Sequence, residues 1–206
     1  MLNAIFFSGF LTSLALIVPI GAQNAFVLKL GLMRQHVLVI ALLCGFMDAV
    51  LILLGVTFAG ATFGQYAWTL LAVKYVGVAF LLAYGFRAFL AAYKHAQPMA
   101  VAPLNQTITL KSALVTCLGF TLLNPHVYLD TVLLIGGISV QYKPNQYDYA
   151  MGALTASFTW FLALGFGARL LRPLFVKAQS WVVLEIAIGL LMWSIAYHIW
   201  FLPIAV

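Results

Sequence analysis

The chain has 206 residues, of which 65% are hydrophobic and 7% are charged, and it carries a formal net charge of +6. Soluble domains carry about 25% charged residues, so this chain has too few charges to coat a water-exposed surface of its size. The composition therefore excludes an ordinary soluble domain and indicates a protein whose solvent is the lipid bilayer.

Six apolar segments follow one another along the chain, and each is long enough to cross a bilayer as a helix of about 20 residues. They cover residues 3–28, 36–62, 67–92, 112–139, 149–169 and 181–202. The sequence predicts an all-α integral membrane protein with six transmembrane helices in a single transporter-like domain, 1–206, and no room for a soluble domain.

The first segment contains polar groups and a proline at membrane depth, in the stretch PIGAQN over residues 19–24. Pro19 removes a backbone N–H and Gly21 adds backbone freedom, so we expect the helix to break here. The amides of Gln23 and Asn24 cannot face lipid without a large cost, so they should face a cavity or another helix. A packing kink with satisfied amides is the alternative interpretation.

Asp48 lies near the middle of the second segment. An aspartate at the centre of a membrane helix costs about 2.5–3.5 kcal/mol on the insertion scale. We interpret it as a candidate group for binding substrate or protons, while a structural hydrogen bond inside the bundle is the alternative.

The fourth segment contains a second break, in the stretch NPHVYLDT over residues 124–131. An Asn124-Pro125 step inside an apolar run starts a turn or a fresh half-helix, whose N-terminal N–H groups attract a carboxylate. Asp130 follows about a turn and a half later, so a carboxylate receptor and a cation receptor would share one element. His126 is a candidate proton relay, although such a histidine more often donates to a backbone carbonyl.

The two halves of the chain show weak similarity. Pro19 and Pro125 occupy similar positions at an offset of 106, and an offset of 109 pairs Asp48 with Ser157. Because each half holds three crossings, the second repeat would be inserted upside down, which is typical of transporters. We expect repeat 1 at 1–93, a cytoplasmic linker at 94–111 and repeat 2 at 112–206.

The ten Lys and Arg residues lie near helix ends rather than in a patch with aromatic residues, so they do not indicate nucleic-acid binding. Eight of them flank the loops after the first, third and fifth segments, and the positive-inside rule places those loops in the cytoplasm and both termini outside. Cys44 and Cys117 lack metal-ligand or CxxC spacing and are interpreted as packing residues.

Three motifs in register carry a family resemblance. The stretch PIGAQNAFV at residues 19–27, Asp48, and the stretch NPHVYLDT at residues 124–131 together resemble the lysine exporter family, and its arginine exporter branch in particular. The resemblance covers essentially the whole chain. One difference is Ala22, where a second proline is common in the family.

The resemblance implies efflux of the basic amino acids arginine and lysine across a bacterial inner membrane, in exchange for protons. Family aspartates that matter for flux map onto Asp48 and Asp130. We therefore take Asp48, Asp130, Gln23, Asn24, Asn124 and His126 as candidate substrate or proton-binding residues, and Pro19, Gly21 and Pro125 as helix-breaking residues.

Other functions stay open as alternatives. An exporter of neutral amino acids or of a divalent metal would share the architecture, and a non-transporting membrane subunit would share the apolar helices. Two acids plus His126 are few ligands for a metal, and the sequence holds no catalytic motif that indicates an enzyme. We expect no cofactor, and the oligomeric state is open with a homodimer slightly favoured.

Overall fold

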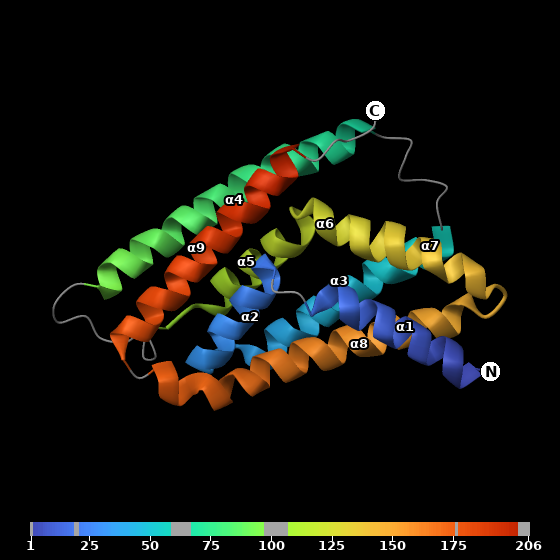
Figure 1. Cartoon of the computed structure of the whole chain (residues 1–206), viewed down its shortest axis with the longest axis horizontal. Coiled ribbons are helices and arrows are strands. Elements are labelled where there is room, and N and C mark those ends of the chain that lie inside the picture. Colours follow the sequence, from blue (N-terminus) through green and yellow to red (C-terminus); the bar gives the residue numbers. More distant parts are fainter. Residues whose placement is uncertain (1, 19–20, 59–66, 97–106, 176, 202–206) are drawn as a thin grey trace.

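The computed structural model describes residues 2–18, 21–58, 67–96, 107–175 and 177–201. Within these residues the chain forms an elongated bundle of helices without a β-strand (Figure 1). The all-α class predicted from the composition is therefore confirmed.

The elements of the first half follow the predicted segments closely. They are α1 (Leu2–Ile17), α2 (Ala22–Met33), α3 (Val37–Phe58) and α4 (Ala67–His95). The first predicted segment is divided between α1 and α2, whose axes differ by 84°. A sharp bend of the first segment was expected from Pro19 and Gly21; Pro19 itself lies outside the described residues.

The second half contains more irregular helix than the first. Its elements are α5 (Leu110–Leu122), α6 (Pro125–Tyr128), the π-helical segment η3 (Leu129–Ile135), α7 (Gly136–Ser139), the 3₁₀ turn η4 (Val140–Tyr142), α8 (Gln146–Gly167), the 3₁₀ segment η5 (Ala168–Phe175) and α9 (Ala178–Phe201). The fourth predicted segment is interrupted between Leu122 and Pro125, as expected. Of the predicted linker 94–111, residues 97–106 lie outside the described residues.

Several helices in the described part of the chain are long and apolar enough to cross a membrane. Val37–Thr57, Gln146–Leu171 and Gln179–Phe201 meet this condition singly, and α1 and α2 meet it only when the bent pair is counted as one span. The predicted third and fourth segments correspond to α4 and to the run from α5 to α7. The count of six crossings stays a prediction.

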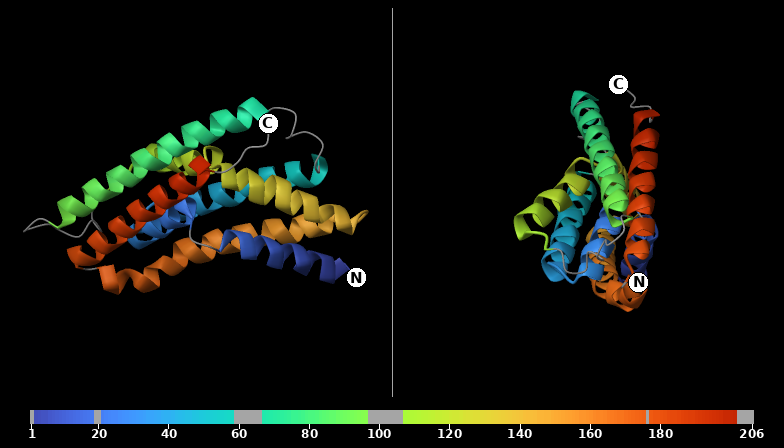
Figure 2. Two further views of the ribbon diagram at one scale, coloured as in Figure 1. Left: turned by 45° about the horizontal axis from the view of Figure 1, so that its top comes forward. Right: turned by 90° about the vertical axis from the view of Figure 1, so that its left-hand side faces the viewer.

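The helices pair through close contacts between distant parts of the chain. α4 lies along α9, and α8 packs against both α1 and α3 (Figures 1 and 2). Glycines allow the approach of α1 to α8, because a Cβ on Gly9 would overlap the backbone of Tyr149 and a Cβ on Gly152 would overlap the backbone of Phe6. The two helices therefore meet backbone to backbone, as small residues permit in membrane proteins.

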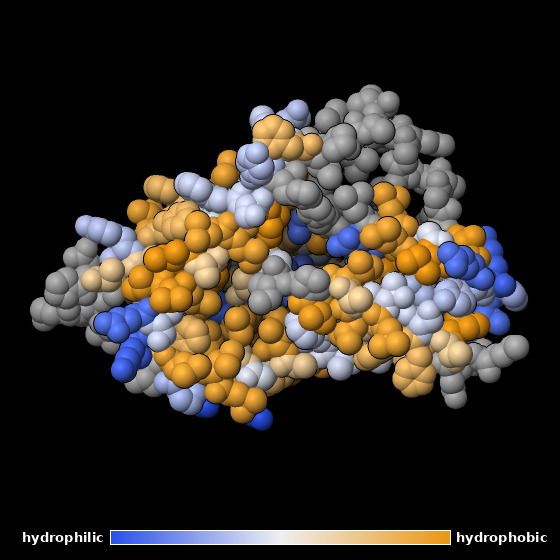
Figure 3. Space-filling model, viewed as in Figure 1, coloured by the Kyte–Doolittle hydropathy of each residue, from blue (hydrophilic) through white to orange (hydrophobic). Residues whose placement is uncertain are grey.

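The outer surface of the bundle is apolar. In α9, large exposed side chains recur every three or four residues, at Val183, Ile186, Leu190, Trp193, Tyr197 and Trp200. On the face seen in Figure 3, hydrophobic residues cover the middle of the long axis and hydrophilic residues gather at its two ends. Such a band is the arrangement that a bilayer requires.

Two buried cysteines pack against each other where α3 meets α5 in the core. Cys44 and Cys117 are both free and fully buried, with their Sγ atoms 3.3 Å apart. They pack beside buried residues that include Phe26 and Phe120. Their position agrees with the interpretation of both as small packing residues.

Candidate functional site

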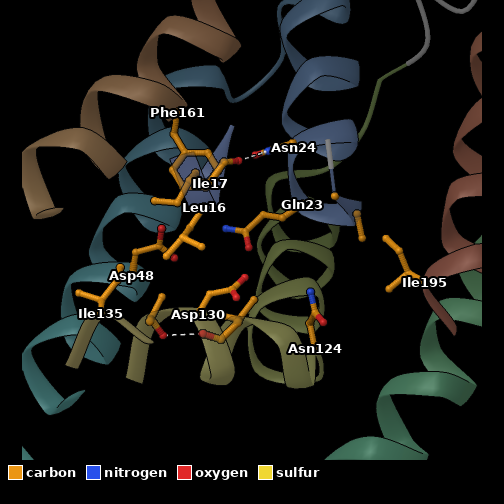
Figure 4. A pocket seen from close by; sticks show the side chains of 14 residues that line it. Leu16, Ile17, Gln23, Asn24, Asp48, Asn124, Asp130, Ile135, Phe161 and Ile195 are labelled. Atoms are coloured by element: carbon orange, nitrogen blue, oxygen red, sulfur yellow. Dashed lines mark hydrogen bonds between the residues drawn. The ribbon is translucent and has the colours of Figure 1, made fainter. Parts of the chain in front are cut away.

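A cavity of about 280 Å³ lies where α1 breaks from α2 (Figure 4). Side chains from α3 and from the region of α6 and η3 form its other walls. Its lining residues are Leu16, Ile17, Gly21, Ala22, Gln23, Asn24, Asp48, Asn124, Val127, Asp130, Thr131, Ile135, Phe161 and Ile195. The cavity therefore brings together both predicted breaks and both predicted aspartates.

Asp48 enters the cavity from α3. The residue is only 4% exposed, and its Oδ2 accepts a hydrogen bond of 2.7 Å from the Ser157 hydroxyl of α8. A single hydroxyl donor cannot satisfy all the acceptor sites of an ionised carboxylate. Asp48 can therefore accept further hydrogen bonds from a ligand or carry a proton.

Asp130 lines the same cavity from the π-helical segment η3, which packs against α3. A π-helix carries hydrogen bonds from residue i to i+5, and such segments recur at functional sites. One residue later, the Thr131 hydroxyl donates to the carbonyl of Val127, with an oxygen–oxygen distance of 2.5 Å. The looser helical turn thus occurs at the position of the second membrane-depth carboxylate.

Asn24 holds the break between α1 and α2. Its Nδ2 donates to the carbonyl of Ile17, the last residue of α1, at 2.6 Å. Its Oδ1 accepts from Nε1 of Trp160 in α8 at 3.3 Å. The carbonyl that the break releases is thereby satisfied inside the protein, as the membrane interior demands.

Gln23 differs from its neighbour Asn24 in its partners. Its side chain reaches into the space that Asp48 and Asp130 border (Figure 4). Gln23 is 8% exposed, and its Nε2 has no hydrogen-bond partner in the described part of the chain; the Cys44 thiol beside it is a weak acceptor. A buried amide donor of this kind is available to a ligand.

The start of α2 also faces the cavity. Gly21 is its N-cap, with φ −102° and ψ −178°, and no side chain caps the helix. Gly21 and the first residues of α2 line the cavity. Because a helix N-terminus presents backbone N–H groups and a partial positive charge, this end can receive a carboxylate.

Asn124 lines the cavity directly before the helix that starts at Pro125. The side chain of His126 lies outside the described residues, so its proposed role as a proton relay stays a prediction. Thus Gly21, Gln23, Asn24, Asp48, Asn124 and Asp130 share one cavity, while Pro19 and the side chains of Pro125 and His126 are not placed.

The charged side chains that line the cavity, among the described residues, are all acidic. Among the described residues, its lining includes the two carboxylates of Asp48 and Asp130 and no Lys, Arg or His. No group of three His, Cys, Asp or Glu residues that could hold a metal occurs in the described part of the chain. The geometry suits a ligand that carries both a cationic group and a carboxylate.

Some lining residues could not be singled out from the sequence. Phe161 and Ile195 contribute ordinary apolar surface, and Thr131 directly follows Asp130. Ser157, the partner of Asp48, had one signal in the sequence, because the offset of 109 between the two halves pairs these residues. That signal indicated corresponding positions and not a hydrogen bond.

Comparison with known proteins shows the family of this chain. Residues 14–201 match the family described as LysE type translocator. The chain is 39% identical to the arginine exporter protein ArgO of Klebsiella pneumoniae and 40% identical to that of Salmonella typhimurium, in both cases over 94% of this chain and 92% of the relative. No solved structure matches the chain. With this coverage and identity, the protein belongs to the LysE type translocator family.

Proposed function

We propose that this protein exports the basic amino acids arginine and lysine across the bacterial inner membrane in exchange for protons. As a member of a translocator family it is a multi-pass membrane transporter and not an enzyme. Export of arginine is supported by relatives that are named arginine exporters over nearly their whole length.

One observation carries the proposal. One cavity is lined by two carboxylates and by no basic side chain among the described residues, beside the start of α2, which no side chain caps. An amino acid with a cationic side chain complements both features: its carboxylate meets the helix N-terminus and its cation meets Asp48 or Asp130. A guanidinium makes bidentate contacts with a carboxylate, whereas the lysine ammonium is a point charge.

Exchange for protons would offset the electrical cost of exporting a cation. An interior-negative potential opposes the exit of one positive charge by about 2.3 kcal/mol per 100 mV. Exchange of one cationic amino acid for one proton moves no net charge, so the pH gradient alone can drive it. A carboxylate that binds either the proton or the cation, but not both, couples the two fluxes.

We also propose that the chain consists of two inverted three-helix repeats, 1–93 and 112–206, joined by a cytoplasmic linker at 94–111. The hydrogen bond between Asp48 and Ser157 supports this, because it joins residues paired by the repeat offset of 109. With the loops that carry most Lys and Arg in the cytoplasm, both termini lie outside.

The third helix of each repeat gives further support through reciprocal contacts. A Cβ on Gly85 would meet the ring of Trp193, and a Cβ on Gly189 would meet the ring of Phe89. These contacts pair the two glycines and the two aromatic residues at an offset of 104. We therefore align the third helices of the proposed repeats at an offset of 104.

The test is efflux of preloaded radiolabelled arginine, lysine and threonine from proteoliposomes, with and without an inward proton gradient. We expect the gradient to accelerate loss of arginine or lysine but not of threonine. Asp48→Asn and Asp130→Asn should each reduce that coupled efflux by about tenfold or more. Asp148→Asn, in the first turn of α8 and outside the cavity, is the matched control.

Unchanged proton-coupled efflux in both Asn variants would sink the assignment of the aspartates. Efflux of threonine alone would move the protein to the neutral amino-acid exporters. No flux of any of the three would favour a non-transporting subunit.

A further inference from the structure

A second cavity, of about 220 Å³, lies between α2, α4, α5 and α9. It is separate from the cavity of Asp48 and Asp130, because the two share no lining residue. The polar and aromatic side chains on its walls are Lys29, Tyr84, Arg87, Ser112, Thr116 and Glu185. Most of these lie near the helix ends that the positive-inside rule assigns to the cytoplasm.

Glu185 is the most buried charge in this second cavity. It is 2% exposed on α9, and its Oε1 lies 2.5 Å from Nζ of Lys29 on α2, whose side chain is 18% exposed. Removing two charges from water costs much of what their attraction returns, so a buried ion pair is weak grounds for a purely stabilising role. The Glu185 carboxylate is thus a group that can bind a cation, and here it holds the Lys29 ammonium.

Arg87 supplies the opposite charge on the same cavity wall. It is exposed, and within the described residues it forms no ion pair. Its guanidinium is suited to bind a carboxylate through two parallel hydrogen bonds. Ser112 and Thr116, one turn apart on α5, add two hydroxyl groups to the lining of the same cavity.

Three aromatic rings pack together at the second cavity, and two of them, Phe26 and Tyr84, line it. Phe26, Tyr84 and Phe120 contact one another, with ring centroids 6.4 Å apart for Phe26 and Tyr84, 5.6 Å for Phe26 and Phe120, and 4.7 Å for Tyr84 and Phe120. Gln23 lines the first cavity and Phe26, one turn later on α2, lines the second. A single turn of α2 therefore contributes to the walls of both cavities.

We propose that the second cavity is a cytoplasmic binding site for the same basic amino acid, occupied before it reaches Asp48 and Asp130. Arg87 binds the α-carboxylate of the ligand, and its cationic side chain displaces Lys29 from Glu185. The proposal rests on the proposed export of basic amino acids, but it assigns a different site and different residues.

Protection of a cysteine from N-ethylmaleimide tests this site in the purified full-length protein. Thr116→Cys places the thiol in the cavity wall, and the wild type, whose Cys44 and Cys117 are fully buried, gives the background labelling. Arginine is the probe ligand. Agmatine, which lacks the carboxylate, and citrulline, which lacks the cation, separate the two proposed contacts.

We expect arginine to protect the cysteine at lower concentration than either analogue. Glu185→Gln should raise the half-protecting concentration of arginine about tenfold and leave that of citrulline unchanged. Arg87→Gln should also raise the half-protecting concentration of arginine about tenfold, but leave that of agmatine unchanged. Lys29→Met should lower the half-protecting concentration of arginine, because the Lys29 ammonium no longer competes for Glu185. If Glu185→Gln does not fold, the double variant Lys29→Met/Glu185→Gln removes both charges and should show the same loss.

The control is the same labelling with Asp48→Asn, which should leave protection unchanged. Absence of protection by arginine in a protein that exports arginine would overturn the second site alone. Absence of both export and protection would overturn the proposed function as well. Equal protection by arginine and citrulline, or a weaker effect of arginine in Lys29→Met, would contradict the role of Glu185.

Discussion

At the scale of single residues, two adjacent amides have different partners. Asn24 uses both ends of its amide within the protein, towards Ile17 and Trp160. Gln23 leaves Nε2 without a partner in the described residues and lines the cavity. The sequence predicted the same role for both, because both are amides at membrane depth; their separate partners depend on which helix each side chain meets.

Because Asn24 and Gln23 have different partners, alanine substitutions at the two positions should have different effects, one on stability and the other on transport. Asn24→Ala should lower the free energy of unfolding by about 1–3 kcal/mol, because it leaves the Ile17 carbonyl unsatisfied. Gln23→Ala should leave the melting temperature in detergent nearly unchanged and raise the KM for arginine efflux about tenfold. Thermal unfolding and efflux on the same preparations measure both. Equal loss of stability in the two variants would contradict the distinction.

At the scale of elements, close contact of helix backbones positions the cavity walls. α8 carries Ser157 and Phe161 and is held against α1 by Gly9 and Gly152. The sequence predicted the span of α8 from its apolar run and found the breaks from proline chemistry. It did not predict the π-helical segment η3, because such segments are rare and the apolar run around Asp130 fits an ordinary α-helix equally well.

A pair of glycine substitutions tests the importance of the contact between α1 and α8. Gly152→Ala should lower the free energy of unfolding by about 1–3 kcal/mol, because its Cβ would overlap the backbone of Phe6. Gly137→Ala is the matched control: no atom lies within 4 Å of the added Cβ, so a gain of about 0.5–1 kcal/mol is expected from helix propensity. Melting temperatures in detergent measure the difference, and similar values for both variants would argue against a tight contact.

At the scale of the whole molecule, the basic residues lie near the ends of the apolar segments. The loops after the predicted first, third and fifth spans hold most of the Lys and Arg residues. The helix pairs that build the two cavities join residues from the two halves of the chain, as in the contacts of Asp48 with Ser157 and of Lys29 with Glu185. The orientation of the chain across the membrane determines which compartment each cavity faces.

Cysteine labelling in intact cells tests that orientation. Lys143→Cys and Lys177→Cys replace exposed lysines on the two predicted sides of the membrane. A membrane-impermeant maleimide should label Lys143→Cys directly, and Lys177→Cys only after the cells are permeabilised. Wild-type protein, with both cysteines buried, is the blank. The reverse pattern would place the second cavity on the outer side.

The sequence by itself determined the membrane class, the positions of the two helix breaks and the acids at membrane depth. These follow from composition, from proline and from the cost of burying charge, which are local properties of the chain. Tertiary structure alone decided that Asp48 and Asp130 border one cavity, that Asn24 closes a break, and that Lys29 meets Glu185 across the bundle. Such contacts join residues far apart in sequence, and only the packing of whole helices brings them within hydrogen-bonding distance.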